Sequence, residues 1–431
     1  MPVKNIKQTI LIIIDSIDRE LLGFLKLKKE LEIKNYRVEF CNKQNFKSSF
    51  NYYKPKIIFC GQIWKTPGLL QSKKSSKIFF LRAESCSGLL DYINEIYKSI
   101  SEVIPDYFCC WGPKELKFLK KKIRNTKLIL TGHPVNELVK KKKKKKKIII
   151  GIATTIRQIT SISRQSILYD LNSLKQNKEY KNSNPFVNID SDISALYGYE
   201  INFLSKLLDI VNDLKKKYKI VLRHHPLEDS KIYNYFENEN IEIDKSISFS
   251  EFCSKIDVLL CYKSSIQIYA YNQKVKVINL EKFLDKDNLK KLNANVINMP
   301  FDKFFPQPKN LIELRKEINR PFKKILAADY FLKNIFNVNQ DKKSSDLIIN
   351  ELKNIDFEKI KFKKIKDEKI SNFFVINFIY KLTPSFLKFH FIDLKRYLKY
   401  IFFHKENEIF HTYSFINRSK INKIKKIVDK F

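Results

Sequence analysis

The sequence predicts an α/β fold made of two successive Rossmann-like domains followed by a helical tail. Short apolar runs rich in β-formers alternate with longer helical patterns, which is typical of βαβ units around a mostly parallel sheet. This alternation starts a second time after eight consecutive lysines, Lys140 to Lys147, and it stops near residue 310, where long patterns rich in Lys and Phe begin. We therefore expect domains at 1–139 and 148–310, a lysine linker at 140–147, and a separate helical module at 311–431.

Six apolar runs are the expected strands of the first domain, at 9–15, 37–40, 56–60, 77–81, 107–111 and 127–132. Helical patterns lie between several of them, for example at 19–34 and 113–122. The second of these helices opens with a proline, which suits a first helical turn. The first domain therefore has the strand and helix content of an open parallel sheet.

The second domain repeats this pattern, with expected strands at 147–155, 219–226, 257–262 and 275–280. Helices are expected at 200–218 and 264–272. Residues 157–196 have weak periodicity and many Ser, Asn and Gln, so we expect an inserted loop there. The lysine run lies between the last strand of one domain and the first of the next, as an interdomain linker would.

The formal net charge of +37 favours an anionic partner, either nucleic acid or a lipid surface. A protein that binds nucleic acid or another polyanion is therefore the main non-enzymatic alternative. However, the lysines are scattered over nearly every segment, and the sequence shows neither a known nucleic-acid-reading module nor an aromatic stacking platform. We expect no specific nucleic-acid partner.

Cysteine usage and hydropathy favour a cytoplasmic protein. The seven cysteines lack paired CxxC spacing, which predicts reduced thiols and no zinc site. No run of eighteen uncharged apolar residues occurs, so no membrane-spanning helix is expected.

Motifs for nucleotide-binding P-loops, dinucleotide fingerprints and zincins do not occur, so the candidate site rests on polar residues that follow predicted strands. Such residues meet at the carboxyl edge of a parallel sheet, where ligands bind. The segment "LRHHP" places Arg223, His224, His225 and Pro226 there. Arg and His offer charge-assisted donors to a phosphate, and the proline would stiffen the loop that presents them. Ser264 and Ser265 follow another strand and begin a helix, where they could hold a phosphate. A surface turn and an ordinary helix cap explain these segments equally well.

Two segments of the first domain also follow predicted strands. "FFLRAESCSG" contains Glu84, a candidate general base, although a surface ion pair with Arg82 is the simpler interpretation. "ILTGHPVNEL" contains Gly132, His133 and Asn136, for which we favour a turn leading into the hinge over direct catalysis.

Taken in order, "YFCCWGPKELKFL", "LTGHPVNEL", "LRHHP" and "YKSSIQIYAYNQKVKVI" resemble the motifs of bacterial surface-carbohydrate biosynthesis proteins, a GT-B-like group similar to bacterial sialyltransferases and polysialyltransferases. The resemblance covers about residues 77 to 280. It implies a GT-B-like fold in which a central cleft separates an N-terminal acceptor domain from a C-terminal nucleotide-donor domain. Departures from the pattern include His133 for the usual Asn, and the acidic motif survives at best as Glu84.

The resemblance implies a glycosyltransferase that moves a sugar, such as a nonulosonic acid, from a nucleotide-sugar donor to a capsule or lipopolysaccharide glycan. His225 would contact the donor phosphate with Ser264 and Ser265 nearby, and Glu84 would deprotonate the acceptor. Gln267 stands where a Glu often binds ribose, while Thr154 and Thr155 end the first strand of the donor domain. Because the resemblance has the donor held by His, Ser and helix N-termini, neither a metal nor a cofactor is expected. A CDP-glycerol-type polyol-phosphate transferase and an inactive homologue are the alternatives.

The tail segment 384–405 has apolar residues at helical spacing bordered by lysines, as an interfacial helix does. We expect it to attach the cytoplasmic protein peripherally to the anionic inner face of the membrane, next to a lipid-linked glycan acceptor. Packing of the same apolar face against the two domains explains the pattern equally well.

Overall fold

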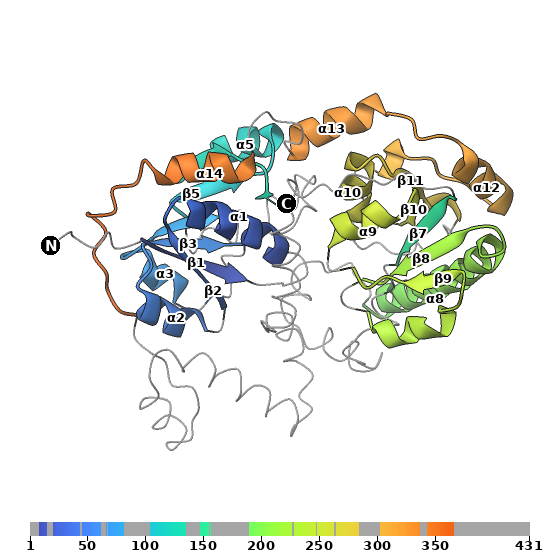
Figure 1. Cartoon of the computed structure of the whole chain (residues 1–431), viewed down its shortest axis with the longest axis horizontal. Helices are drawn as coiled ribbons and strands as arrows, with labels where there is room; N and C mark the ends of the chain where they lie inside the picture. The colour runs from blue at the N-terminus through green and yellow to red at the C-terminus, as the bar shows by residue number, and fades with distance from the viewer. Residues whose placement is uncertain are drawn as a thin grey trace, which may run out of the picture. The chain divides into compact units, whose positions relative to one another are not determined.

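In a computed structural model the chain divides into two compact units, and each is described here by itself. One unit comprises Met1–Leu138 with Tyr330–Phe431, and the other comprises Val139–Asp329. Figure 1 shows one β-sheet in each unit with helices packed along it. The structure describes residues 8–14, 20–43, 45–61, 66, 68–81, 104–134, 147–154, 156, 189–225, 228–246, 248–262, 264–283, 302–336 and 343–365.

The first unit contains a six-stranded sheet in the order β2-β1-β3-β4-β5-β6, in which every neighbouring pair is parallel. Its strands are β1 (Thr9–Ile14), β2 (Arg37–Asn42), β3 (Ile57–Cys60), β4 (Lys77–Phe80), β5 (Tyr107–Cys110) and β6 (Lys127–Leu130). Its helices are α1 (Leu22–Ile33), α2 (Phe46–Tyr53), α3 (Leu69–Ser72) and α5 (Pro113–Lys120). All four residues of β3 are buried, because helices cover both faces of such a sheet. All six strands lie within the predicted runs or extend them by two residues.

The second unit contains a five-stranded, all-parallel sheet in the order β11-β10-β7-β8-β9. Its strands are β7 (Ile149–Ala153), β8 (Lys219–Arg223), β9 (Ile241–Ile243), β10 (Val258–Cys261) and β11 (Lys276–Asn279). Its helices are α8 (Ile189–Leu214), α9 (Phe249–Lys255) and α10 (Ile266–Asn272), with 3-10 turns η3 (Ser230–Phe236), η4 (Glu281–Phe283) and η5 (Asp302–Phe304). The chain runs outward from β7 first to one side and then to the other, so the topological switch point lies between β7 and β10. The predicted fold class of two Rossmann-like α/β units is confirmed.

Two local features differ from the predicted pattern. Strand β9 is only Ile-Glu-Ile, which is too short to produce a strand signal in the sequence. Residues 189–196, within the predicted insert, form the first part of α8.

The described residues after 310 do not form one separate module. They include α12 (Leu311–Asn319), α13 (Leu326–Phe336) and α14 (Ser344–Leu352). Leu314 and Ile318 pack into the core of the second unit, whereas Ile365 packs into the core of the first. Asn51 also exchanges two hydrogen bonds with the backbone of Ile365, at 2.8 and 2.9 Å. The apolar positions of the tail therefore complete the cores of both units.

None of the described helices combines the length and the apolar character that crossing a bilayer requires.

Candidate functional site

The candidate site lies at the carboxyl edge of the sheet in the second unit. Ala153, the last residue of β7, pairs with Arg223 of β8 on one side and with Cys261 of β10 on the other. The segments that follow these three strands therefore leave the sheet side by side. They carry Thr154, the His224–His225 pair and Ser264, so the predicted clustering at one edge follows from the register of the sheet.

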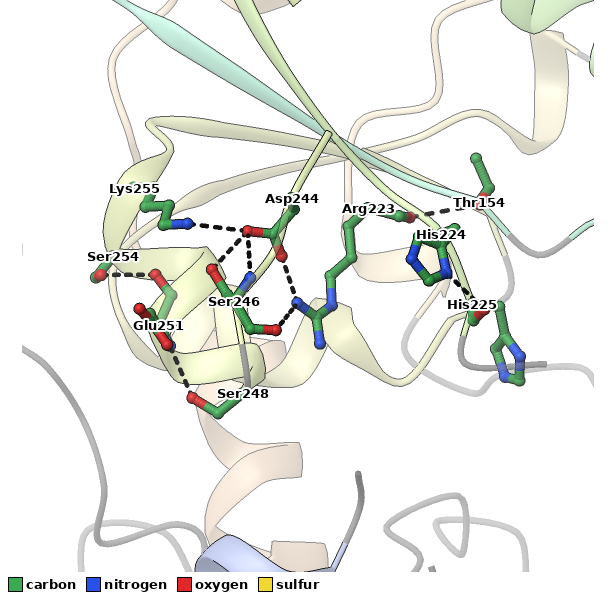
Figure 2. Close-up of polar contacts among 10 residues, drawn as sticks. All are labelled: Thr154, Arg223, His224, His225, Asp244, Ser246, Ser248, Glu251, Ser254 and Lys255. Atoms are coloured by element: carbon green, nitrogen blue, oxygen red, sulfur yellow. Dashed lines mark hydrogen bonds and ion pairs between the residues drawn. The ribbon is translucent and has the colours of Figure 1, made fainter. Parts of the chain in front are cut away.

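Arg223 does not face this edge as a free phosphate ligand. Its Nη1 is ion-paired with the carboxylate of Asp244 and donates to the carbonyl oxygen of Ser246 at 3.1 Å (Figure 2). Its guanidinium also lies over the rings of Phe249 and Phe252, 5.0 and 5.5 Å from their centroids. These contacts give Arg223 a structural role in joining β8 to α9, a partner set that the sequence pattern did not indicate.

Asp244, which follows β9, is the acceptor of this cluster and has a fully buried side chain. One carboxylate oxygen accepts from Lys255 Nζ at 3.1 Å and from the Ser246 hydroxyl at 2.5 Å. Burial raises the pKa of Asp244, but Arg223, Ser246 and Lys255 together outweigh burial and hold the pKa below its usual value. The carboxylate is therefore ionised at neutral pH and balanced by two cations.

The two histidines of the "LRHHP" segment have different surroundings. His224 stacks on Tyr233 with 6.1 Å between ring centroids, and its Nδ1 lies 3.0 Å from the carbonyl oxygen of His225. His225 is half-buried, and its imidazole points away from the Arg223–Asp244 pair (Figure 2). Of the residues predicted on this segment to bind phosphate, Arg223 is bound to Asp244, whereas the His225 imidazole points away from that pair.

Glu228, three residues after His225, is fully buried beneath this segment. Its Oε2 accepts hydrogen bonds from the Thr154 hydroxyl at 2.5 Å, the Tyr233 hydroxyl at 2.8 Å and the His225 backbone N–H at 3.0 Å. Burial raises the pKa of Glu228, while the donors from Thr154, Tyr233 and the backbone of His225 act in the opposite direction. The sequence analysis missed Glu228, because a single acidic residue in a charge-rich chain carries no pattern.

Thr154, at the end of β7, was predicted to contact the nucleotide-sugar donor. Its side chain is buried, and its hydroxyl donates to Glu228. Its backbone N–H donates to the carbonyl oxygen of Arg223 at 3.0 Å. Thr154 therefore links the ends of β7 and β8 and has its own donors already engaged.

The segment after β10 presents Ser264 and Ser265, both half-buried. The Ser264 Oγ lies 3.5 Å from the backbone N of Ile266, and Ser265 makes no side-chain cap hydrogen bond to α10. Gln267 is fully buried in α10, so its side chain is not presented at the open edge as the predicted ribose contact would be. The serines are the part of this motif that remains at the surface.

Gly132 and His133 belong to the core of the first unit. Gly132 has φ +70°, which favours glycine, and its N–H donates to Cys110 O at 3.0 Å. His133 is fully buried, stacked on Trp111 at 5.0 Å and in edge contact with Phe24 at 6.1 Å between centroids. These contacts are those of a packed turn residue.

Other predicted site residues and segments lie outside the described residues. They are Glu84 and its neighbour Arg82, Asn136, the linker residues 140–146, Thr155, Pro226 and the tail segment 384–405. Within the described ranges, no group of three or more His, Cys, Asp or Glu residues could hold a metal ion.

A separate hollow of about 810 Å³ in the second unit is lined by Lys206, Asp213, Lys216 and Lys309 among others. Its lining residues come from α8 and the residues just after it, from η4 and from the start of α12, and not from the segments after β7, β8 and β10 that carry the candidate site. Asp213 within it is already bound by Arg315. The hollow is therefore distinct from the candidate site.

Comparisons with known proteins add the following. No protein-family model and no curated protein sequence matches the chain. A variant of the wall teichoic acid polymerase TagF aligns at 14% identity and TM-score 0.49, covering 80% of this chain and 89% of the other. A putative UDP-N-acetylglucosamine 2-epimerase from Listeria monocytogenes aligns at 12% identity and TM-score 0.44, covering 80% and 96%.

The UDP-GlcNAc 2-epimerase of Methanocaldococcus jannaschii, in complex with UDP-GlcNAc and UDP, aligns at 13% identity and TM-score 0.45, covering 81% and 99%. These structures are a polymerase and epimerases, so the resemblance to sialyltransferases stays a prediction. At such identities they do not identify the ligand of this chain.

Proposed function

We propose that this chain is a glycosyltransferase that moves a sugar from a nucleotide-sugar donor to a bacterial surface glycan. The observation that carries the proposal is the pairing of Ala153 with both Arg223 and Cys261, which brings the segments after β7, β8 and β10 to one edge. At that edge, His225 offers an imidazole, and Ser264 and Ser265 offer hydroxyl groups. Hydrogen-bond donors of this kind suit the phosphate of a nucleotide.

In the proposed reaction, an oxygen of the acceptor hydroxyl attacks the anomeric carbon of the donor. The bond from that carbon to the phosphate oxygen breaks, and the nucleotide leaves with the electron pair. His225, with the two serines, stabilises the negative charge on the leaving phosphate. Glu84 takes the proton of the acceptor hydroxyl. A nonulosonic acid as the transferred sugar is the finer part of the proposal.

A thermal-shift screen against CMP, CDP, UDP and GDP tests the binding part of the proposal, since a nucleotide that binds the folded state must raise its melting temperature. His225→Ala should then abolish turnover and weaken nucleotide binding while the melting temperature without nucleotide stays unchanged. His224→Phe is the matched control, because it keeps the ring that stacks on Tyr233. Normal turnover in His225→Ala would contradict the proposal.

The alternatives predict other outcomes of the same experiments. A CDP-glycerol-type transferase would use the same phosphate contacts but would consume CDP-glycerol and no nucleotide sugar. A nucleic-acid-binding protein would show nanomolar affinity for nucleic acid at about 0.15 M salt, whereas nonspecific attraction to a chain of this charge would be weaker and steeply salt-dependent.

We also propose that the acceptor is a glycan or a lipid-linked glycan at the inner face of the membrane, reached through segment 384–405. Removal of the residues after about 370 should weaken binding to liposomes that contain anionic lipid, because each nearby lysine contributes about 1 kcal/mol. Unchanged liposome binding would contradict this attachment.

A further inference from the structure

Glu228 joins three segments at the carboxyl edge of the second sheet. Its Oε2 accepts from Thr154 after β7, from the backbone of His225 after β8 and from Tyr233 in η3. Three donors on one buried oxygen of a single side chain tie these segments to one another. The contact set is larger than a helix cap or a surface turn needs.

Glu228 and His225 are also linked in both directions. The N–H of Glu228 donates to the carbonyl oxygen of His225 at 2.9 Å, and the N–H of His225 donates to the Glu228 carboxylate at 3.0 Å. These reciprocal bonds hold the backbone of His225 against Glu228. The backbone that carries the His225 imidazole is therefore fixed by Glu228 and, through Glu228, by Thr154 and Tyr233.

We propose that Glu228 is a positioning residue that holds the turn carrying His225 so that its imidazole is presented to the donor phosphate. The role in donor binding rests on the proposed function, whereas the fixing of the turn stands on the contacts alone. Glu228 is fully buried and acts through His225, so it has no contact with the substrate in this role.

The chemistry of the contacts requires a carboxylate. All three neighbours are donors, and a carboxylate oxygen can accept from all of them. Glu228 Oε1 is also buried, and the backbone N–H of Ile156 is a further donor that favours the ionised carboxylate. In Glu228→Gln the amide NH₂ would either face the three donors or occupy this buried position without an acceptor, and both arrangements are unfavourable.

Hydrogen exchange of the free protein tests the fixing of the turn without any ligand. In Glu228→Gln, the backbone amides of the peptide 223–229 should exchange faster than in the parent protein, while peptides of β10 and β11 stay unchanged. Glu237→Gln is the matched control, because it removes the same charge from an exposed position at the end of η3. Unchanged exchange of 223–229 in Glu228→Gln would overturn the proposal. If that variant fails to fold, Tyr233→Phe removes one donor and should show the same local effect.

A double-mutant cycle tests the link to His225. The cycle uses whichever of CMP, CDP, UDP and GDP gives the largest thermal shift, with affinities measured by calorimetry. Glu228→Gln should weaken nucleotide binding about tenfold, and adding it to His225→Ala should weaken binding little further, because it acts through the same imidazole. Additive losses would mean that Glu228 supports only the general structure, and would overturn the positioning role. Unchanged affinity in His225→Ala would instead reject the proposed function, and the exchange experiment would still decide whether Glu228 fixes the turn.

Discussion

Gly112, which follows Trp111 in the first unit, allows close packing against the end of helix α13. A Cβ added at this position would lie 2.3 Å from the carbonyl oxygen of Ile335 and 2.5 Å from that of Asn334. Both atoms belong to the backbone, so relief to ordinary contact requires α13 to shift by roughly 1 Å. Gly112 has φ −153°, which any residue adopts, so the available space alone decides the outcome.

Gly112→Ala should therefore lower the free energy of unfolding of the first unit by about 2–4 kcal/mol. Overpacking of a closely packed site costs about 1–3 kcal/mol. Displacement of α13 would also expose part of Leu332 and Ile335, which are 5% and 7% exposed and contribute about 2 kcal/mol each when buried. The range of about 2–4 kcal/mol adds the overpacking cost to a partial loss of the burial of Leu332 and Ile335.

Urea denaturation followed by tryptophan fluorescence measures this unit selectively, because both tryptophans of the chain, Trp64 and Trp111, belong to it. Gly198→Ala is the control: it lies within α8 of the other unit, and nothing lies within 4 Å of its added Cβ. That variant should leave the fluorescence transition unchanged and stabilise its own helix by about 0.5–1 kcal/mol. A change below about 0.5 kcal/mol in Gly112→Ala would refute the packing argument.

Two further predictions concern ionisable groups. Asp244→Asn should lower the free energy of unfolding of the second unit by about 3 kcal/mol at pH 7, because Arg223 and Lys255 lose their buried counter-charge. Folding lowers the pKa of Asp244, so its contribution to the free energy of unfolding is fully present above the unfolded pKa and is lost as the pH falls through the folded pKa. Urea titrations followed by circular dichroism should therefore show the stability difference between Asp244→Asn and the parent protein narrowing below about pH 3.8. A difference that does not depend on pH would contradict the ionised pair. The six described cysteines are all buried, and burial raises the pKa of Cys109 and Cys253 to about 12, so at most one of the seven thiols should react with Ellman's reagent before unfolding. Rapid reaction of two or more thiols in the native protein would show that the cores are open.

Strands that are fully buried were predictable because their apolar runs are continuous and bounded by polar residues. The runs at 56–60 and 77–81 correspond to β3 and β4 within one residue at each end. Helix α8 shows where periodicity fails. Leu204, Leu207, Leu208, Val211 and Leu214 share helical spacing, which predicts one buried face. Leu207, Val211 and Leu214 are buried, but Leu208 is 40% exposed while Ile210 is buried. An apolar stripe predicts the face of a helix only approximately, because neighbouring elements decide which side chain at its border is covered.

The position of the candidate residues after the strands was predictable from the sequence, but the orientation of their side chains was not. The "LRHHP" segment indicated three donors to phosphate, yet Arg223 is bound to Asp244, which lies twenty-one residues later in the chain. Thr154 and Gln267 were likewise predicted from their place after a strand and near a helix start, and both side chains are buried. Glu228 carried no pattern, although its contacts connect three segments of the site.

The sequence by itself determined the two parallel α/β sheets, because alternating strands and helices leave few topologies open. Tertiary structure alone decided which of the polar residues that follow the strands of the second unit are bound within the protein. A buried Asp244 must be neutralised by nearby cations, and a buried Glu228 must find donors, so these two carboxylates engage Arg223 and Thr154. The need to pair a buried carboxylate arises only in the folded protein, where residues that are far apart in the sequence lie side by side. Tertiary packing also divided the tail between the two units, since its apolar residues are buried wherever each core is incomplete.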